Sequence, residues 1–213
     1  MHAAKSTAAA PVSFSHQGPF DQTCLVHTVN NLLADDAGAA TKRELDRVAD
    51  ELAPGTSVFT NPHKSWTGLG NYDANVLSVC LQRRGINVSY HDRRKPLSDL
   101  DLSEGSMVGL VLNAPTSGNL LRGLFGFEGR HWTALRLVVG DGSEAGATGG
   151  DAWWFFDSRK RGPVRIGDAR EEEGRAAILA FLATHLEKGG EVLVATRNTT
   201  ESGHDDEPSA ADR

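Results

Sequence analysis

Residues 16–33 read HQGPFDQTCLVHTVNNLL. After Cys24, apolar residues recur at the three- and four-residue spacing of an α-helix: Leu25, Val26, Val29, Leu32 and Leu33. Because a loop-type stretch precedes it, we predict that Cys24 lies at the N-terminus of this helix. Backbone N–H groups and the positive end of the helix dipole favour the thiolate there, which is the nucleophilic form of cysteine. Cys24 is therefore a candidate nucleophile, and the alternative is a small buried hydrophobe in a core helix.

The composition is typical of one globular domain, with 213 residues of which 39% are hydrophobic and 23% are charged. The formal net charge of -6 leaves no basic excess to neutralise phosphates, so no nucleic-acid partner is expected. Two cysteines are too few for a disulfide framework, and neither a signal peptide nor a long apolar run is present. We therefore expect a protein without a membrane-spanning segment that resides in the reducing cytoplasm or also in the nucleus.

Both ends of the chain lack the apolar periodicity of folded segments. Residues 1–10, MHAAKSTAAA, predict a disordered lead rather than a targeting peptide. Residues 197–213 are polar and mostly acidic, which predicts a disordered acidic tail. One folded domain is therefore expected over residues 11–196.

Three further helices are indicated by apolar stripes at helical spacing. They are expected at residues 41–52, 73–84 and 171–186. Thr41 can cap the first of these, with Glu44 in the capping-box position, and Asn71 or Asp73 can cap the second. Residues 53–70 are rich in Pro, Gly, Asn and Ser and predict an irregular excursion. The apolar side chains expected to anchor it are Val58, Phe59 and Trp66.

Strand-type segments dominate the second half of the chain. They are expected at residues 86–90, 107–112, 131–138, 153–156 and 191–195. Helices followed mostly by strands predict an α+β fold, with the N-terminal helices packed on a mostly antiparallel sheet. Residues 140–151, GDGSEAGATGGD, are low in complexity and predict a long hairpin loop between the third and fourth strands.

If the hairpin is roughly symmetric about this loop, we expect His131 to lie opposite Asp157. An imidazole that shares the thiol proton and a carboxylate that orients it are what a cysteine nucleophile needs. Taken alone, His131 also fits a half-exposed surface residue and Asp157 a turn residue. The order of parts, with Cys on an early helix and His and Asp on later strands, is papain-like and favours the catalytic interpretation.

Four separated motifs carry a family resemblance. They are CLVHTVNNLL at residues 24–33, NPHKSWTGLGNYDANVL at 61–77, GRHWTALR at 129–136 and FFDSRKRGP at 155–163. Together they resemble the Josephin family of papain-like deubiquitinases, and most closely its small members that contain little beyond the Josephin domain. The resemblance implies a Josephin catalytic domain over residues 11–196 with a helical-hairpin arm. It also implies that Cys24 is the nucleophile, His131 the general base and acid, and Asp157 the third catalytic residue.

One departure from the family pattern concerns the oxyanion hole. The family usually has a Gln before the nucleophile whose side chain completes that hole, and its place is held here by Pro19, which cannot donate. Gln17 can take this role if the loop bulges, and Gln22 is the alternative; we favour Gln17. Loss of one oxyanion donor typically lowers turnover about a hundred- to thousandfold.

The resemblance further implies that the partner is ubiquitin or polyubiquitin, with the ubiquitin C-terminus in a narrow cleft and no metal or organic cofactor. The body of ubiquitin is expected against an arm at residues 41–70. Residues 114–129 form an unusually apolar loop, which is either a partner surface or a satellite core under the sheet. No feature fixes the oligomeric state, and a monomer is expected.

Three functions stay open at this point. The first is a thiol-dependent deubiquitinase that cleaves after the C-terminal glycine of ubiquitin. The second is a ubiquitin-binding module with weak or lost catalysis, which the missing Gln suggests. The third is acyl transfer on another substrate by the same triad. A metal site formed by His16, Cys24 and His27 is not favoured, because no further ligand has suitable spacing.

Overall fold

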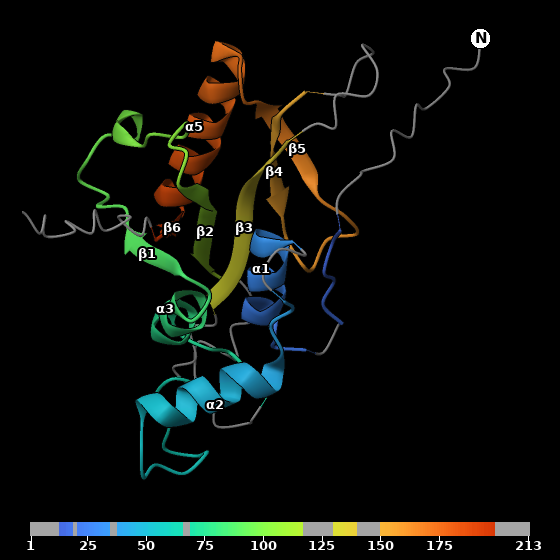
Figure 1. Cartoon of the computed structure of the whole chain (residues 1–213). Helices are drawn as coiled ribbons and strands as arrows, with labels where there is room; N and C mark the ends of the chain where they lie inside the picture. The colour runs from blue at the N-terminus through green and yellow to red at the C-terminus, as the bar shows by residue number, and fades with distance from the viewer. Residues whose placement is uncertain are drawn as a thin grey trace, which may run out of the picture.

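A computed structural model of the chain describes residues 13–18, 21–34, 38–65, 69–116, 130–139 and 150–198. The expectations about the lead, the acidic tail beyond Asn198, Trp66 and most of the two long loops fall outside these residues. Within them the fold is α+β (Figure 1). No helix in the described part of the chain is long and apolar enough to cross a membrane.

The described elements follow the predicted order. They are α1 (Cys24–Leu33), α2 (Lys42–Leu52), α3 (Ala74–Gln82), β1 (Ile86–Tyr90), the 3-10 turn η1 (Leu97–Asp99), β2 (Met107–Pro115), β3 (Arg130–Val138), β4 (Ala152–Phe156), β5 (Val164–Asp168), α5 (Glu172–Glu187) and β6 (Glu191–Arg197). The predicted helices and strands are therefore confirmed, with some ends shifted by a few residues. Strand β5 was not predicted, because Arg165 and Gly167 interrupt its strand-like pattern.

The strands form one sheet in the order β1-β6-β2-β3-β4-β5, and every pair is antiparallel. One face of the sheet packs against α1 and α3, where Leu25, Val29 and Leu77 are fully buried. The other face packs against α5 through Ile178 and Leu182. Helix α2 packs on α3 rather than on the sheet, so it protrudes at one end of the molecule (Figure 1).

Side-chain caps fix the starts of α2 and α3. Thr41 Oγ1 accepts a hydrogen bond from the backbone N–H of Glu44 at 3.2 Å, as predicted. Asp73 Oδ1 accepts from the N–H groups of Asn75 and Val76 at 3.0 and 3.1 Å. Asp73 is therefore the cap of α3, and Asn71 is not. Such caps contribute about 1 kcal/mol each to stability.

The arm differs from the expected helical hairpin. After α2, residues 53–65 form turns, and this described stretch contains no second helix. Helix α2 ends at the cap residue Ala53, and Pro54 and Gly55 follow, with a φ of 80° at Gly55 that keeps the chain from continuing as a helix. Within its described residues the arm thus consists of one helix with a turn-rich return.

Two of the expected apolar anchors of this return are wrong, because Val58 is 40% and Phe59 72% exposed, and the third, Trp66, lies outside the described residues. Polar contacts hold the return instead. Buried Asn61 donates from Nδ2 to the carbonyl of Ala49 at 2.9 Å. Lys64 forms an ion pair with Asp50 at 2.7 Å. The pattern of apolar residues does not reveal these contacts, because they are polar contacts that depend on how the turns fold back onto α2.

Candidate active site

Cys24 is the first residue of α1, as predicted, and its residue exposure is only 3%. The helix is held by apolar side chains that face β3 and α3, chiefly Leu25, Val29 and Leu32. This packing fixes the direction of the helix, so its first turn points the thiol toward the start of β3. A free, buried cysteine at a helix N-terminus is a suitable position for a nucleophile.

His131 and Asp157 form the central contact of the site. His131 is the second residue of β3, and Asp157 directly follows β4. The distance from His131 Nε2 to Asp157 Oδ1 is 2.7 Å, and the two side chains are 12% and 13% exposed. Asp157 Oδ1 also accepts from the backbone N–H of Arg159 at 3.0 Å. Two donors therefore fix the carboxylate, which in turn orients the imidazole.

The predicted register of this hairpin is wrong by two residues. Ala134 pairs with Phe156, and the pairing continues away from the site as Leu135 with Phe155. Extended back, this register places Asp157 opposite Thr133, and His131 is its diagonal neighbour. The side chains still meet, because a diagonal pair lies within reach of an imidazole and a carboxylate. The hairpin is symmetric about its loop, with Val138 opposite Ala152, and it is the predicted pairing of His131 with Asp157 that is displaced from this centre.

The contact between His131 and Asp157 shifts the pKa of both side chains. Burial lowers the pKa of His131, but the Asp157 hydrogen bond and the interaction with Cys24 outweigh it, so the pKa lies above its usual value. Burial raises the pKa of Asp157, but the hydrogen bonds from His131 and the Arg159 N–H hold it below its usual value. An imidazole between a thiol and a carboxylate can thus carry a positive charge.

The second ring nitrogen of His131 is the one left for the thiol. Nδ1 is buried and makes no hydrogen bond of regular geometry with the described residues, whereas Nε2 is held by Asp157. The Cys24 thiol nevertheless lies close enough to raise the pKa of His131. Such loose contacts are common in active sites without substrate. The structure thus brings the three predicted residues together.

Gln17 lies beside this group and is 4% exposed. Its backbone N–H donates to the carbonyl of Ser158 at 2.9 Å, and its side-chain Nε2 donates to the carbonyl of Asp21. Gln22 is placed differently, because its carbonyl accepts from the N–H of Asn71 at 2.9 Å and it pairs with Gly70. The role of Gln17 in an oxyanion hole stays a prediction.

Residues 70–72, where the arm ends, contact both the loop before Cys24 and the residue after His131, and the sequence pattern missed these contacts. A Cβ on Gly70 would lie 2.5 Å from the carbonyl oxygen of Gln22, so only glycine fits there. The carbonyl of Tyr72 accepts from Trp132 Nε1 at 2.9 Å, and the Tyr72 hydroxyl donates to Asp46 of α2 at 2.9 Å. The one signal in the sequence is the glycine itself, which marks a close backbone approach.

Polar residues on α1 serve packing rather than chemistry. Asn30 exchanges two hydrogen bonds with the backbone of Ala40, at 2.6 and 3.1 Å, and Asn31 does the same with Ser15, at 2.7 and 3.1 Å. His27 Nδ1 contacts the Ser15 hydroxyl at 2.7 Å, and burial lowers its pKa. No cluster of three or more potential metal ligands occurs among the described residues.

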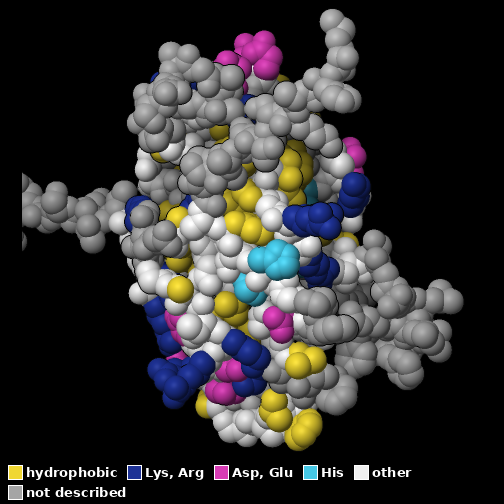
Figure 2. Space-filling view, turned by 90° about the vertical axis from the view of Figure 1, so that its right-hand side faces the viewer, with side chains coloured by type: hydrophobic (Ala, Val, Ile, Leu, Met, Phe, Trp, Pro, Cys, Tyr) yellow, Lys and Arg dark blue, Asp and Glu magenta, His cyan; other side chains and the backbone are white. Residues whose placement is uncertain are grey.

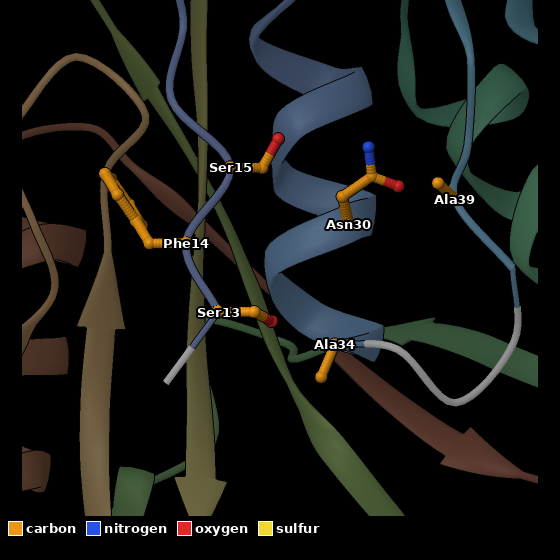
Figure 3. Close-up of a pocket in the computed structure, with 6 residues that line it drawn as sticks. All are labelled: Ser13, Phe14, Ser15, Asn30, Ala34 and Ala39. Atoms are coloured by element: carbon orange, nitrogen blue, oxygen red, sulfur yellow. The ribbon is translucent and has the colours of Figure 1, made fainter. Parts of the chain in front are cut away.

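A pocket of about 350 Å³ lies on this flank of α1 and is shown in Figure 3. Ser15 and Asn30 lie on two of its sides, and Asn30 points toward the segment that carries Ala39. The polar atoms of Asn30 are already used by Ala40. The lining includes none of Cys24, His131 and Asp157, so this pocket is separate from the candidate site.

The rim next to Asp157 is basic. Arg159, Lys160 and Arg161 are exposed, and Lys160 helps to lower the pKa of Asp157. Figure 2 shows histidine side chains near the middle of one face with Lys and Arg side chains beside them. Hydrophobic side chains gather at the lower end of this face, where the turns after α2 lie in Figure 1.

Comparison with known proteins agrees with this arrangement. The chain matches the Josephin family over residues 20–196. It is 34% identical over 205 residues to Josephin-2 of Mus musculus and of Homo sapiens, which covers 95% of this chain and 97% of each relative. It is 31% identical over 199 residues to a Josephin-like protein of Drosophila melanogaster, covering 92% and 79%. The family is associated with cysteine-type deubiquitinase activity. The chain therefore belongs to the Josephin family.

Proposed function

We propose that this protein is a thiol-dependent deubiquitinase that hydrolyses the isopeptide or peptide bond after the C-terminal glycine of ubiquitin. The observation that carries the proposal is the half-buried His131, which lies between Cys24 and Asp157 and contacts the latter at 2.7 Å. This arrangement meets the geometric requirement of a cysteine nucleophile with an oriented base. Family membership supplies the substrate class.

The proposed reaction begins when His131 holds the Cys24 proton as an imidazolium next to Asp157. The Cys24 sulfur bonds to the carbonyl carbon of the terminal glycine, and the carbonyl π electrons move to its oxygen. When this intermediate collapses, the carbon–nitrogen bond breaks and His131 gives its proton to the leaving amine. Water then attacks the thioester, with His131 taking its proton, and the carbon–sulfur bond breaks to restore Cys24.

The negative oxygen of the intermediate needs hydrogen-bond donors. We assign this role to the backbone N–H of Cys24 and the side-chain amide of Gln17. Support comes from the position of Gln17, whose amide lies between Asp21, before the nucleophile, and Ser158, after the catalytic carboxylate. Because a thiolate nucleophile requires a reduced sulfur, we place the activity in the cytoplasm or also in the nucleus.

We place the body of ubiquitin against the arm. Val58 and Phe59 are 40% and 72% exposed, and neighbouring apolar side chains that stay exposed often mark a partner surface. Phe59→Ser should raise KM for a ubiquitin substrate while leaving kcat and the free energy of unfolding unchanged. Val164→Ser is the matched control, because Val164 is 51% exposed but lies on edge strand β5, away from the arm. An equal effect of both changes would argue against the arm.

The experiment that tests the activity uses ubiquitin carrying a C-terminal electrophile. We expect covalent labelling of the wild type and none of Cys24→Ala. The alternative function, a ubiquitin-binding module, is favoured by Pro19 at the usual place of the oxyanion Gln. Binding of ubiquitin without labelling of Cys24 would support that module. If the ubiquitin probe does not label the protein but the protein hydrolyses small acyl esters, its substrate is a different acyl compound.

A further inference from the structure

The side chain of Gln17 is held by two groups far apart in the sequence. The Ser158 hydroxyl donates to Gln17 Oε1 at 3.1 Å, across 141 residues. Gln17 Nε2 donates to the carbonyl of Asp21, three residues before Cys24. Ser158 is 1% exposed and Gln17 is 4% exposed, so solvent does not compete for the contact between them. The backbone N–H of Gln17 also donates to the carbonyl of Ser158 at 2.9 Å, which is a third contact that holds Gln17.

These contacts determine which way the amide of Gln17 faces. An amide oxygen only accepts and an amide nitrogen only donates, while the carbonyl of Asp21 only accepts. If the amide turned over, Gln17 Oε1 would face the Asp21 carbonyl, and two acceptors would meet with no hydrogen atom between them. The Ser158 hydroxyl stabilises the observed orientation by giving Oε1 a donor. Nε2 therefore faces the loop before Cys24.

An amide nitrogen carries two N–H groups. Among the described residues, only the Asp21 carbonyl accepts from Gln17 Nε2, which leaves its second N–H available to a substrate oxygen. Resting on the proposed function, we infer that Ser158 is a positioning residue for this donor: its hydroxyl keeps Gln17 Nε2 turned toward the oxyanion. Ser158 acts through Gln17 and does not touch the reacting atoms.

The hydroxyl of Ser158 is not part of the His131–Asp157 contact. Asp157 Oδ1 takes its hydrogen bonds from His131 and from the backbone N–H of Arg159. Loss of the hydroxyl therefore leaves the ion pair of the site unchanged. Ser158→Ala could lower turnover by misplacing the oxyanion donor or by making the Cys24 thiolate less reactive. These two causes can be measured separately.

Alkylation of Cys24 by iodoacetamide requires a reactive thiolate but forms no oxyanion, whereas acyl hydrolysis requires both. In Ser158→Ala we expect kcat to fall about ten- to hundredfold, somewhat less than when an oxyanion donor is removed outright. KM, the alkylation rate and its pH profile should match the wild type. Thr28→Val is the control, because buried Thr28 Oγ1 has no partner among the described residues and this change should leave every readout unaltered.

The Gln17→Ala background sharpens the test. Because Ser158 acts only through Gln17, Ser158→Ala should have no further effect on kcat there. Three results would each overturn the inference. They are a wild-type kcat in Ser158→Ala, a kcat that falls as far when Ser158→Ala is added to Gln17→Ala as when it is added to the wild type, and a changed pH profile of alkylation. Failure of the proposed function is seen separately. If the wild type hydrolyses a small activated ester but no ubiquitin conjugate, the substrate assignment fails and the same comparisons are made on the ester. A wild type that hydrolyses neither overturns both.

Discussion

Replacing Asp157 by Asn removes one charge and little else. The amide oxygen of Asn can still accept from His131 Nε2 and the Arg159 N–H, which are 2.7 and 3.0 Å from the carboxylate oxygen. A buried hydrogen bond to a charged group contributes about 1.5–3 kcal/mol, against about 0.5–1.5 kcal/mol for a neutral one. The difference of about 1–1.5 kcal/mol corresponds to roughly a five- to tenfold loss in kcat/KM.

The pH dependence of the Asp157→Asn variant gives the sharper result. Burial lowers the pKa of His131, while Asp157 and Cys24 raise it above its usual value. Loss of the carboxylate removes one raising influence, so the pKa of His131 falls. The alkaline limb of the kcat/KM profile, where imidazolium is lost, should therefore move to lower pH.

The assay is hydrolysis of a fluorogenic ubiquitin conjugate across pH, with circular dichroism to check the fold. An alkaline limb that stays in place would refute the role given to Asp157. A loss of activity as complete as that of His131→Ala, in a folded protein, would show that the charge does more than orient and stabilise the imidazolium.

Three further predictions concern residues around the site. Gly70→Ala should destabilise the fold by about 1–3 kcal/mol and lower kcat, because its Cβ would lie 2.5 Å from the Gln22 oxygen; urea unfolding and turnover check this. Glu44→Gln should lower the free energy of unfolding by about 1–3 kcal/mol at pH 7, since Glu44 pairs with Arg84 at 2.6 and 2.9 Å. The Arg84 bond holds the pKa of Glu44 below 4.5 against the effect of burial, so this difference should shrink as pH falls through that range; equal differences at pH 7 and pH 3 would contradict it. Cys80 should resist iodoacetamide at pH 8 while Cys24 reacts, because burial raises the pKa of Cys80 to about 11; peptide mass spectrometry locates the label.

Features that depend on local pattern could be predicted from the sequence. The helix that starts at Cys24 and the Thr41 cap follow from apolar spacing and from the chemistry of the first turn. The joint placement of Cys24, His131 and Asp157 was also predicted, since it rests on the order of elements and on four motifs.

Features that depend on tertiary geometry could not be predicted. The register of the β3–β4 hairpin depends on which two residues close its loop, Val138 and Ala152, and composition does not fix these ends to within one residue. Phe59 has the character of an anchor but is exposed, because hydrophobicity alone does not say whether a surface is available to cover it. Ser158 had no local signal, since its partner Gln17 is 141 residues away.

The central claim is that His131 activates Cys24, and one measurement tests it most directly. It is kcat/KM of His131→Ala on a fluorogenic ubiquitin conjugate, with the free energy of unfolding measured on the same sample. We expect no detectable turnover in a variant that unfolds cooperatively like the wild type. Turnover equal to that of the wild type would contradict the claim, because the Cys24 thiol would then need no imidazole.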